Sequence, residues 1–149
     1  MAIKTSTGLA AHLMVTGSAK AAFDDGFIKV YSGSAPATAD AVASGDLLWT
    51  VSVDGDGTGI TFEATADGRS MVKATAETWQ GATTAGTAGY FRLVAAADDG
   101  TESTTQPRVQ GVVGSNAGAD LYMSNTTLTT DAALDAKVLA AFSVTLPTN

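Results

Sequence analysis

Short alternations of apolar and polar residues, separated by turns rich in Gly and Asp, fill the chain from Phe27 onward. The clearest alternation covers residues 47–53, where Thr50 and Ser52 would point to one side of an extended chain. The residues predicted to lie on the opposite, buried side are Leu47, Trp49, Val51 and Val53. An alternation of apolar and polar residues with a period of two is typical of a strand with one face in a core. Residues 27–31, which are rich in β-branched and aromatic types, predict a second strand.

The sequence Asp54-Gly55-Asp56-Gly57 predicts a hairpin turn, because Gly supplies positive φ angles and Asp tolerates them. Ile60 and Phe62 are then expected in the return strand. Further strands are predicted at residues 69–73, 77–82, 90–95, 107–113, 121–123, 126–129 and 138–146. In the last of these, Phe142, Val144 and Leu146 alternate with the polar residues at positions 143 and 145. Residues 131–137 predict one helical turn at most.

The first part of the chain has a different pattern. Hydroxyl side chains at residues 5–7 are suitable helix N-caps, and Leu9, Leu13 and Met14 recur at helical spacing, which predicts a short helix over about residues 7–15. Gly17 ends this helix, and Ser18 is a candidate cap for another helical turn at residues 19–23. Two interpretations remain open: the helix covers an open end of the sandwich, or it is an arm that docks on another subunit.

Many short strands without crossover helices indicate an all-β fold, an antiparallel β-sandwich of the jelly-roll or immunoglobulin-like type with a short N-terminal helix. The 149-residue length suits one domain. We therefore expect residues 1–26 to form an N-terminal helical arm and residues 27–149 a single β-sandwich domain.

Composition and charge exclude several classes of function. The chain has no Cys, which removes disulfides and thiolate metal sites. Its net charge is −7 and its Lys and Arg residues are scattered singly, so we expect no direct nucleic-acid binding. The apolar runs are too short for a membrane span, and the patch at residues 13–15 is too weak for a signal peptide.

No constellation of catalytic residues is visible, and we expect neither an enzyme nor a cofactor. Residues 54–59 resemble the start of a calcium loop, but Thr65 stands where the loop needs a bidentate Glu, and strands flank it. The pairs Asp24-Asp25 and Asp98-Asp99 each precede a Gly and are interpreted as solvated turn tips. His12, the sole histidine, lacks further ligands for a metal. Trp49 and Trp79 are expected in the core.

Several segments of the chain carry a pattern shared with a known group of proteins. In the stretch 27–48 a strand ends in Tyr31-Ser32-Gly33, a Pro-Ala loop with Asp40-Ala41 follows, and Leu47-Leu48 comes next. In this pattern the chain resembles small virion proteins of tailed bacteriophages. The N-terminal Thr-Gly-Leu block, residues 59–64 and residues 90–95 are also similar to those proteins, so the resemblance spans most of the chain.

This resemblance implies a capsid decoration (cement) protein that binds the outer surface of the major capsid protein lattice and stabilises the head. It implies a homodimer or homotrimer, made in the cytoplasm of the bacterial host and located on the capsid exterior. If the N-terminal helix docks on a neighbour, its interface residues are expected to be Leu9, His12, Leu13 and Met14. The alternatives are a tail, baseplate or head–tail connector component, or a carbohydrate-binding β-sandwich module.

Overall fold

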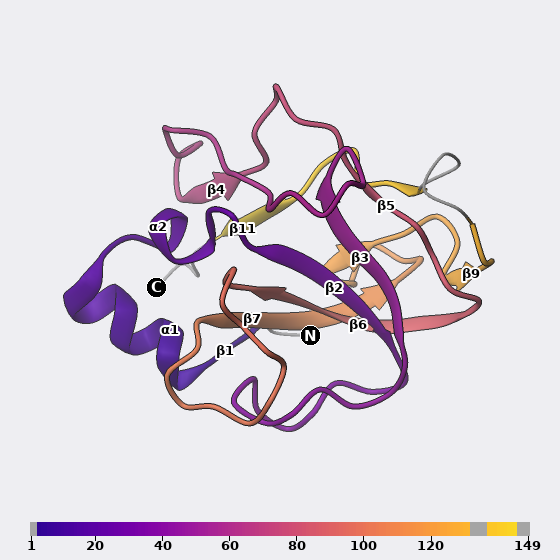
Figure 1. The fold of residues 1–149 in the computed structure, drawn as a ribbon, viewed down its shortest axis with the longest axis horizontal. Coiled ribbons are helices and arrows are strands. Elements are labelled where there is room, and N and C mark those ends of the chain that lie inside the picture. Colours follow the sequence, from indigo (N-terminus) through magenta and orange to yellow (C-terminus); the bar gives the residue numbers. More distant parts are fainter. Residues whose placement is uncertain (1–2, 132–136, 146–149) are drawn as a thin grey trace.

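The computed structural model describes residues 3–131 and 137–145 (Figure 1). These residues form an antiparallel, sandwich-like all-β fold with short N-terminal helices, which confirms the predicted fold class. The strands of the main sheet, in spatial order, are β1 (Lys4–Thr5), β7 (Arg108–Gly114), β6 (Gly86–Val94), β2 (Phe27–Ser32), β3 (Leu47–Val53), β5 (Trp79–Gly81) and β10 (Lys137–Val138). Strand β9 (Thr127–Leu128) pairs with β6, and β8 (Leu121–Tyr122) runs parallel to β7. A separate pair joins β11 (Ser143–Thr145) to β4 (Ser70–Val72).

One face of the main sheet carries the apolar core. Strand register places apolar residues of neighbouring strands directly opposite one another, and two rows result: Trp49, Val30 and Phe91, and Val51, Ile28, Leu93 and Val109. All seven are at least 99% buried. Phe142, just before β11, packs edge-on against Phe91 with ring centroids 5.7 Å apart. The layer that contains β11 and β4 therefore covers this face of the sheet (Figure 1).

Strand β3 has the predicted bounds, but its alternation is broken near the start. Its partner strand pairs Val30 with Trp49 and Tyr31 with Leu47, so Leu48 is an extra, bulged residue. A bulge moves the residues beyond it to the other face. Leu48 is consequently buried and Leu47 is 44% exposed, contrary to the prediction for Leu47. Trp49 and Trp79 lie in the core as predicted.

The predicted hairpin turn at residues 54–57 is present, and the backbone N–H of Val53 donates to the carbonyl of Thr58 at 2.9 Å. Asp54 has a φ of 52°, the left-handed conformation that Asp tolerates better than most residues. The predicted return strand was wrong. Ile60 forms an isolated bridge with Gly26, and Phe62 forms one with Lys73, so the chain crosses to the second layer instead of continuing beside β3.

The other predicted strands each overlap an observed strand, with one break. Residues 138–146 were predicted as one strand, whereas β10 and β11 are separated by residues 139–142. The separation follows from pairing, because β10 joins β5 and β11 joins β4 of the other layer. Leu146, and most of the helical turn predicted at residues 131–137, lie outside the described residues.

The N-terminal segment forms α1 (Thr7–Ala11), a π-helical turn η1 (His12–Thr16) and α2 (Ala19–Phe23). Ser6 and Ser18 cap the two α-helices, with side chains that accept from Leu9 N at 3.0 Å and Ala21 N at 3.1 Å. The predicted α-helix over residues 7–15 therefore ends earlier. From His12 onward the turn is π-helical, and the N–H of Gly17 donates to His12 O, five residues back.

This segment packs into the same core as the strands. Leu9, Ala22 and Phe23 are buried with the core residues of the sheet, and β1 pairs with β7. Gly8 lies so close to the backbone of Thr105 and Gln106 that a Cβ there would overlap it. Residues 3–26 thus cover one end of the sandwich, with the helices on the left in Figure 1.

Candidate functional site

The face of the main sheet opposite the core is buried by polar contacts, which the sequence pattern did not reveal. Its central side chains are Arg92, Arg108 and Gln110, all at least 99% buried. Arg92 Nε donates to Gln110 Oε1 at 3.0 Å. Together with Lys4, which lies opposite Gln110 at the sheet edge, these residues form what we call the basic face.

The loop of residues 33–46 lies over the basic face, and its carbonyl groups accept the hydrogen bonds. Lys4 Nζ donates to Ala37 O at 2.9 Å, Gln110 Nε2 to Pro36 O at 2.8 Å and Arg92 Nη1 to Ala41 O at 2.8 Å. Arg108 Nη1 reaches the carbonyls of Ala39 and Asp40 at 3.3 and 3.2 Å. This loop is therefore fixed in place although it has no regular secondary structure.

Arg108 also binds Asp98, which corrects the interpretation of Asp98-Asp99. The Arg108 Nε and Nη2 groups both donate to the Asp98 carboxylate, and the two side chains are 0% and 1% exposed. Asp98 is thus a buried ion-pair partner rather than a solvated turn tip. Asp99 accepts from Thr101 in an exposed turn, and these hydrogen bonds lower the pKa of Asp99 below its ordinary value.

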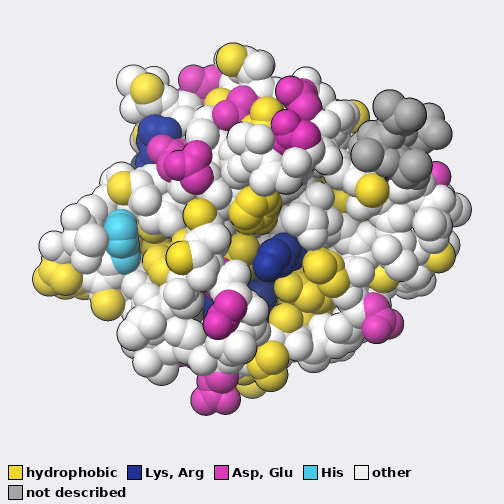
Figure 2. Space-filling view, viewed as in Figure 1, with side chains coloured by type: hydrophobic (Ala, Val, Ile, Leu, Met, Phe, Trp, Pro, Cys, Tyr) yellow, Lys and Arg dark blue, Asp and Glu magenta, His cyan; other side chains and the backbone are white. Residues whose placement is uncertain are grey.

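A first candidate interaction surface is the π-helical turn η1. Leu13 is 43% exposed, Met14 81% and Val15 87%. Hydrophobic side chains project at the left end of the molecule in Figure 2, where η1 lies in Figure 1. Residues 5–19 contain no Asp, Glu, Lys or Arg. We call Leu13, Met14 and Val15 the apolar tip.

The four residues predicted for an interface fall into different environments. Leu9 is only 3% exposed and belongs to the chain's own core, so it is not accessible to a neighbour. His12 is half-buried, with Nε2 3.2 Å from Ser18 O. Leu13 and Met14 lie in the apolar tip. Val15 belongs to the same apolar patch but was not among the predicted interface residues, although it is the most exposed of the three.

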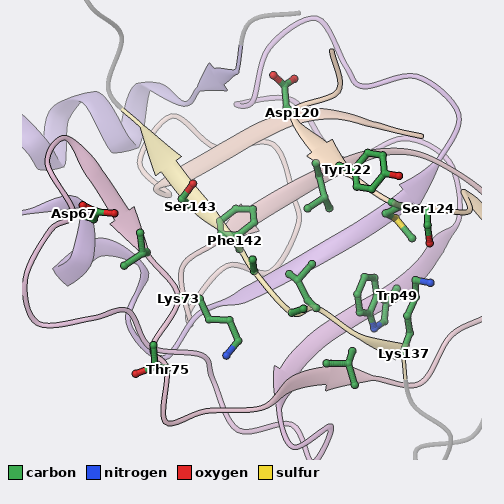
Figure 3. Close-up of a pocket in the computed structure, with 17 residues that line it drawn as sticks. Trp49, Asp67, Lys73, Thr75, Asp120, Tyr122, Ser124, Lys137, Phe142 and Ser143 are labelled. Carbon is green, nitrogen blue, oxygen red and sulfur yellow. The ribbon is translucent and has the colours of Figure 1, made fainter. Parts of the chain in front are cut away.

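A second candidate surface is an open groove of about 990 Å³ between β8, β10 and the segment that leads into β11. Figure 3 shows Tyr122, Trp49 and Lys137 toward one end of it and Asp67 and Ser143 toward the other. Its floor is apolar and buried, with Leu121, Met123, Leu139 and Phe142 all under 9% exposed. Its rim includes Tyr122, which is 61% exposed, and Val138, which is 53% exposed.

The acidic and basic side chains that line this groove are equal in number, and one of them, Lys73, already makes hydrogen bonds. Two acidic residues, Asp67 and Asp120, and two basic residues, Lys73 and Lys137, line it. Lys73 Nζ donates to the carbonyls of Ala74 and Glu77 and lies 5.5 Å from the centre of the Trp79 ring. The groove therefore offers an apolar floor with no net charge.

Within residues 3–131 and 137–145, no group of three or more His, Asp or Glu side chains is arranged to hold a metal ion. In the Asp-Gly turn at residues 54–57, Asp56 Oδ1 accepts from Thr58 N at 2.8 Å, so this oxygen is engaged within the turn. No helix in this part of the chain is long and apolar enough to cross a bilayer.

No family model matches the chain, and neither the curated proteins nor the solved structures contain a match to it.

The groove was not predicted from the sequence, because it is lined by segments that are distant from one another in the chain. The basic face has one sequence signal, since Arg92, Arg108 and Gln110 interrupt otherwise apolar strands. A cation inside such a strand marks the face opposite the apolar core, and only the structure shows that this face is also buried.

Proposed function

We propose that this chain is a virion structural protein of a tailed bacteriophage, most specifically a capsid decoration protein. It binds the outer surface of the major capsid protein lattice as a homo-oligomer and stabilises the head. In this proposal it is made in the cytoplasm of the bacterial host and sits on the capsid exterior. The resemblance of residues 27–48 and of the other segments named above supports this family.

The structural observation that carries the proposal is the apolar tip. Met14 and Val15 are more than 80% exposed, on a helical turn anchored to the core through Leu9. Exposed apolar side chains grouped in this way favour contact with another protein. The absence of charge in residues 5–19 also keeps the desolvation cost of such a contact low. This feature suits a protein whose role is to bind another protein through its surface.

The first experiment is quantitative gel densitometry of purified particles, before and after heads are separated from tails. Copies comparable in number to the major capsid protein, all in the head fraction, are the expected result. A few copies in the tail fraction would assign the chain to a tail, baseplate or connector role instead. Absence from particles would overturn the virion proposal altogether.

A second experiment tests the tip directly. Deleting residues 1–22 would also remove Leu9 and Ala22 from the core, so surface substitutions are cleaner. We expect Met14→Ser/Val15→Ser to weaken binding to capsids that have been stripped of this protein. Val42→Ser is the matched control, because Val42 is also an exposed apolar residue, at 58%, but lies in the loop over the basic face.

Tyr122 favours one alternative function. It is an exposed aromatic ring beside the groove, and carbohydrate-binding modules use such rings as stacking platforms. Binding of the purified protein to host surface glycans, lost on Tyr122→Ala, would support that alternative. Unchanged glycan binding in this variant, or none in either protein, would count against it.

A further inference from the structure

We propose that Lys29, Tyr31 and Arg92 form a binding site for a small oxyanion, a phosphate ion or a carboxylate. We call these three residues the anion site. They lie on the polar side of the main sheet, where β2 and β6 pair. The anion site shares no residue with the apolar tip, so this inference is independent of the proposed function.

Arg92 is a buried cation that lacks a counter-charge among the described residues. It is 1% exposed. Its Nε and Nη1 groups donate to Gln110 Oε1 and Ala41 O, which are both neutral acceptors. Its Nη2 group is also buried and has no hydrogen-bond partner among the described residues. Buried donors are normally satisfied and buried charges normally paired, because removing them from water is otherwise costly. Arg92 therefore has a donor and a positive charge left for a ligand.

The neighbouring Arg108 shows what Arg92 is missing. Arg108 is as deeply buried, but its Nε and Nη2 groups both donate to the carboxylate of Asp98. No carboxylate of the described residues forms such a pair with Arg92. Burial lowers the pKa of Arg92 below its ordinary value, which is the direction expected for a cation in a dry site without an anion beside it.

Strand pairing brings a second unpartnered cation next to Arg92. Lys29 of β2 lies directly opposite Arg92 of β6. Residues paired in this way share a face of the sheet, with Cβ atoms about 4.5–5.5 Å apart. Lys29 is half-buried, and its ammonium group forms no hydrogen bond or ion pair within the described part of the chain. Two positive charges therefore lie side by side without a negative charge between them.

Tyr31 adds a neutral donor on the same face, two residues along β2 from Lys29. Its ring stacks on that of Tyr90, with centroids 5.1 Å apart. The Tyr90 hydroxyl is engaged with the backbone of Ser44, whereas the Tyr31 hydroxyl has no partner among the described residues. Burial, and then the neighbouring Tyr90, raise the pKa of Tyr31. The Tyr31 hydroxyl thus keeps its proton at neutral pH and can donate it to an anion.

The combination of donors selects the class of ligand. Ammonium and guanidinium groups bind oxyanions through short, charge-assisted hydrogen bonds, and a hydroxyl donor completes such a site. A water molecule would satisfy Arg92 Nη2 but would leave the charges of Lys29 and Arg92 unbalanced. Figure 2 shows Lys and Arg side chains near the centre of the visible face, over β2, with hydrophobic side chains beside them. An anion can therefore approach this part of the molecule although the whole chain carries a charge of −7.

NMR titration of the ¹⁵N-labelled chain tests the site. Sodium phosphate is added in one series and sodium acetate in another, with sodium chloride keeping the ionic strength constant. We expect saturable shifts of the amide signals of β2 and β6 with a Kd of about 1 mM. Lys29→Gln should weaken this binding about tenfold or more, because it removes a charge-assisted hydrogen bond. Lys137→Gln is the matched control, since Lys137 is also half-buried and makes no hydrogen bond or ion pair within the described residues, and it should leave the Kd unchanged.

Tyr31→Phe provides a second variant that keeps the ring stack, and it should weaken binding by about threefold to tenfold. Tighter binding of phosphate than of acetate would indicate a free phosphate ion as the ligand. The reverse order would indicate a carboxylate, the group that an acidic side chain of a partner carries. The absence of saturable shifts in both series would overturn the proposal and leave water as the partner of Arg92. An equal Kd for the wild type and Lys29→Gln would also refute it, because the anion would then bind elsewhere.

Discussion

The two faces of the main sheet are both buried, but by opposite means. On one face, side chains such as Ile28, Phe91 and Leu93 exclude water by apolar packing against the second layer. On the other face, Arg92 and Arg108 are equally buried, and loop carbonyl groups accept from the Nη1 group of each. Arg92 Nη2 is buried without a hydrogen-bond partner among the described residues. Apolar packing tolerates adjustment, whereas removing one partner of a buried ion pair such as Arg108–Asp98 leaves the other charge without compensation. The comparison predicts that the two faces respond differently to substitution.

The largest effect is expected on the basic face. Arg108→Leu leaves the buried Asp98 carboxylate unpaired and removes donors from the carbonyls of Ala39, Asp40 and Thr101. We expect a loss of about 3–5 kcal/mol in the free energy of unfolding, measured by urea titration. The double variant Arg108→Leu/Asp98→Leu should recover part of this loss, because no buried charge remains without a partner. A single-variant loss below about 1 kcal/mol, the range of exposed ion pairs, would contradict this account.

The apolar face should show a smaller loss that no second substitution repairs. Leu93 is fully buried between Ile28 and Val109, and Leu93→Ala leaves a cavity. We expect a loss of about 3 kcal/mol in the same urea titration. Leu47→Ala is the control, because the β3 bulge leaves Leu47 exposed, and it should change stability by no more than about 0.5 kcal/mol. Similar losses in both variants would place Leu47 in the core and contradict the bulge.

The next largest loss of stability is expected at Ser6, where the N-terminal segment contacts the basic face. Ser6 Oγ donates to Gln106 O at 2.8 Å and accepts from the N–H groups of Leu9 at 3.0 Å and Arg108 at 2.8 Å. Ser6→Ala should therefore cost about 2 kcal/mol in the free energy of unfolding. Ser18→Ala removes an exposed cap with one such bond and should cost about 1 kcal/mol or less. Equal costs would mean that Ser6 acts as an ordinary cap and does not tie α1 to β7.

The sequence predicted one face of the sheet better than the other. A repeat of two residues is visible along one strand, so the core positions of Trp49 and Val51 followed from local pattern. The basic face depends on contacts such as that between Arg92 and Ala41, which are 51 residues apart in the chain. Isolated Lys and Arg residues are normally exposed, and composition alone therefore suggested a scattered surface charge.

The two candidate surfaces also differ in how far the sequence could predict them. The apolar tip could be predicted in part, because Leu13 and Met14 stand out in a polar segment. Val15 continues the same apolar run, but the run alone does not show which of its side chains project from the fold. The groove could not be predicted, since its walls come from strands that pair with different partners. Local pattern therefore identified the projecting surface and missed the concave one.

The smallest effect concerns acid stability at the edge of the apolar layer, where Glu77 accepts hydrogen bonds from Thr61 N at 3.0 Å and Trp79 Nε1 at 2.7 Å. Partial burial of the carboxylate opposes ionisation, but these hydrogen bonds, those of Thr61 first, outweigh it and lower the pKa of Glu77. The ionised group therefore contributes stability above its unfolded pKa and loses it as the pH falls through the lower folded pKa.

Urea midpoints of the wild type and Glu77→Gln between about pH 7 and about pH 3, a range that spans the ordinary pKa of glutamate, measure this contribution. We expect the variant to be less stable near neutral pH and to lose less stability on acidification. Hydrogen bonds also lower the pKa values of Asp56, Glu63 and Asp99, but these groups are present in both proteins and cancel in the difference. Parallel pH profiles would show that Glu77 has the same pKa in the folded and unfolded chain. The link between Thr61 and Trp79 would then not depend on the charge of Glu77.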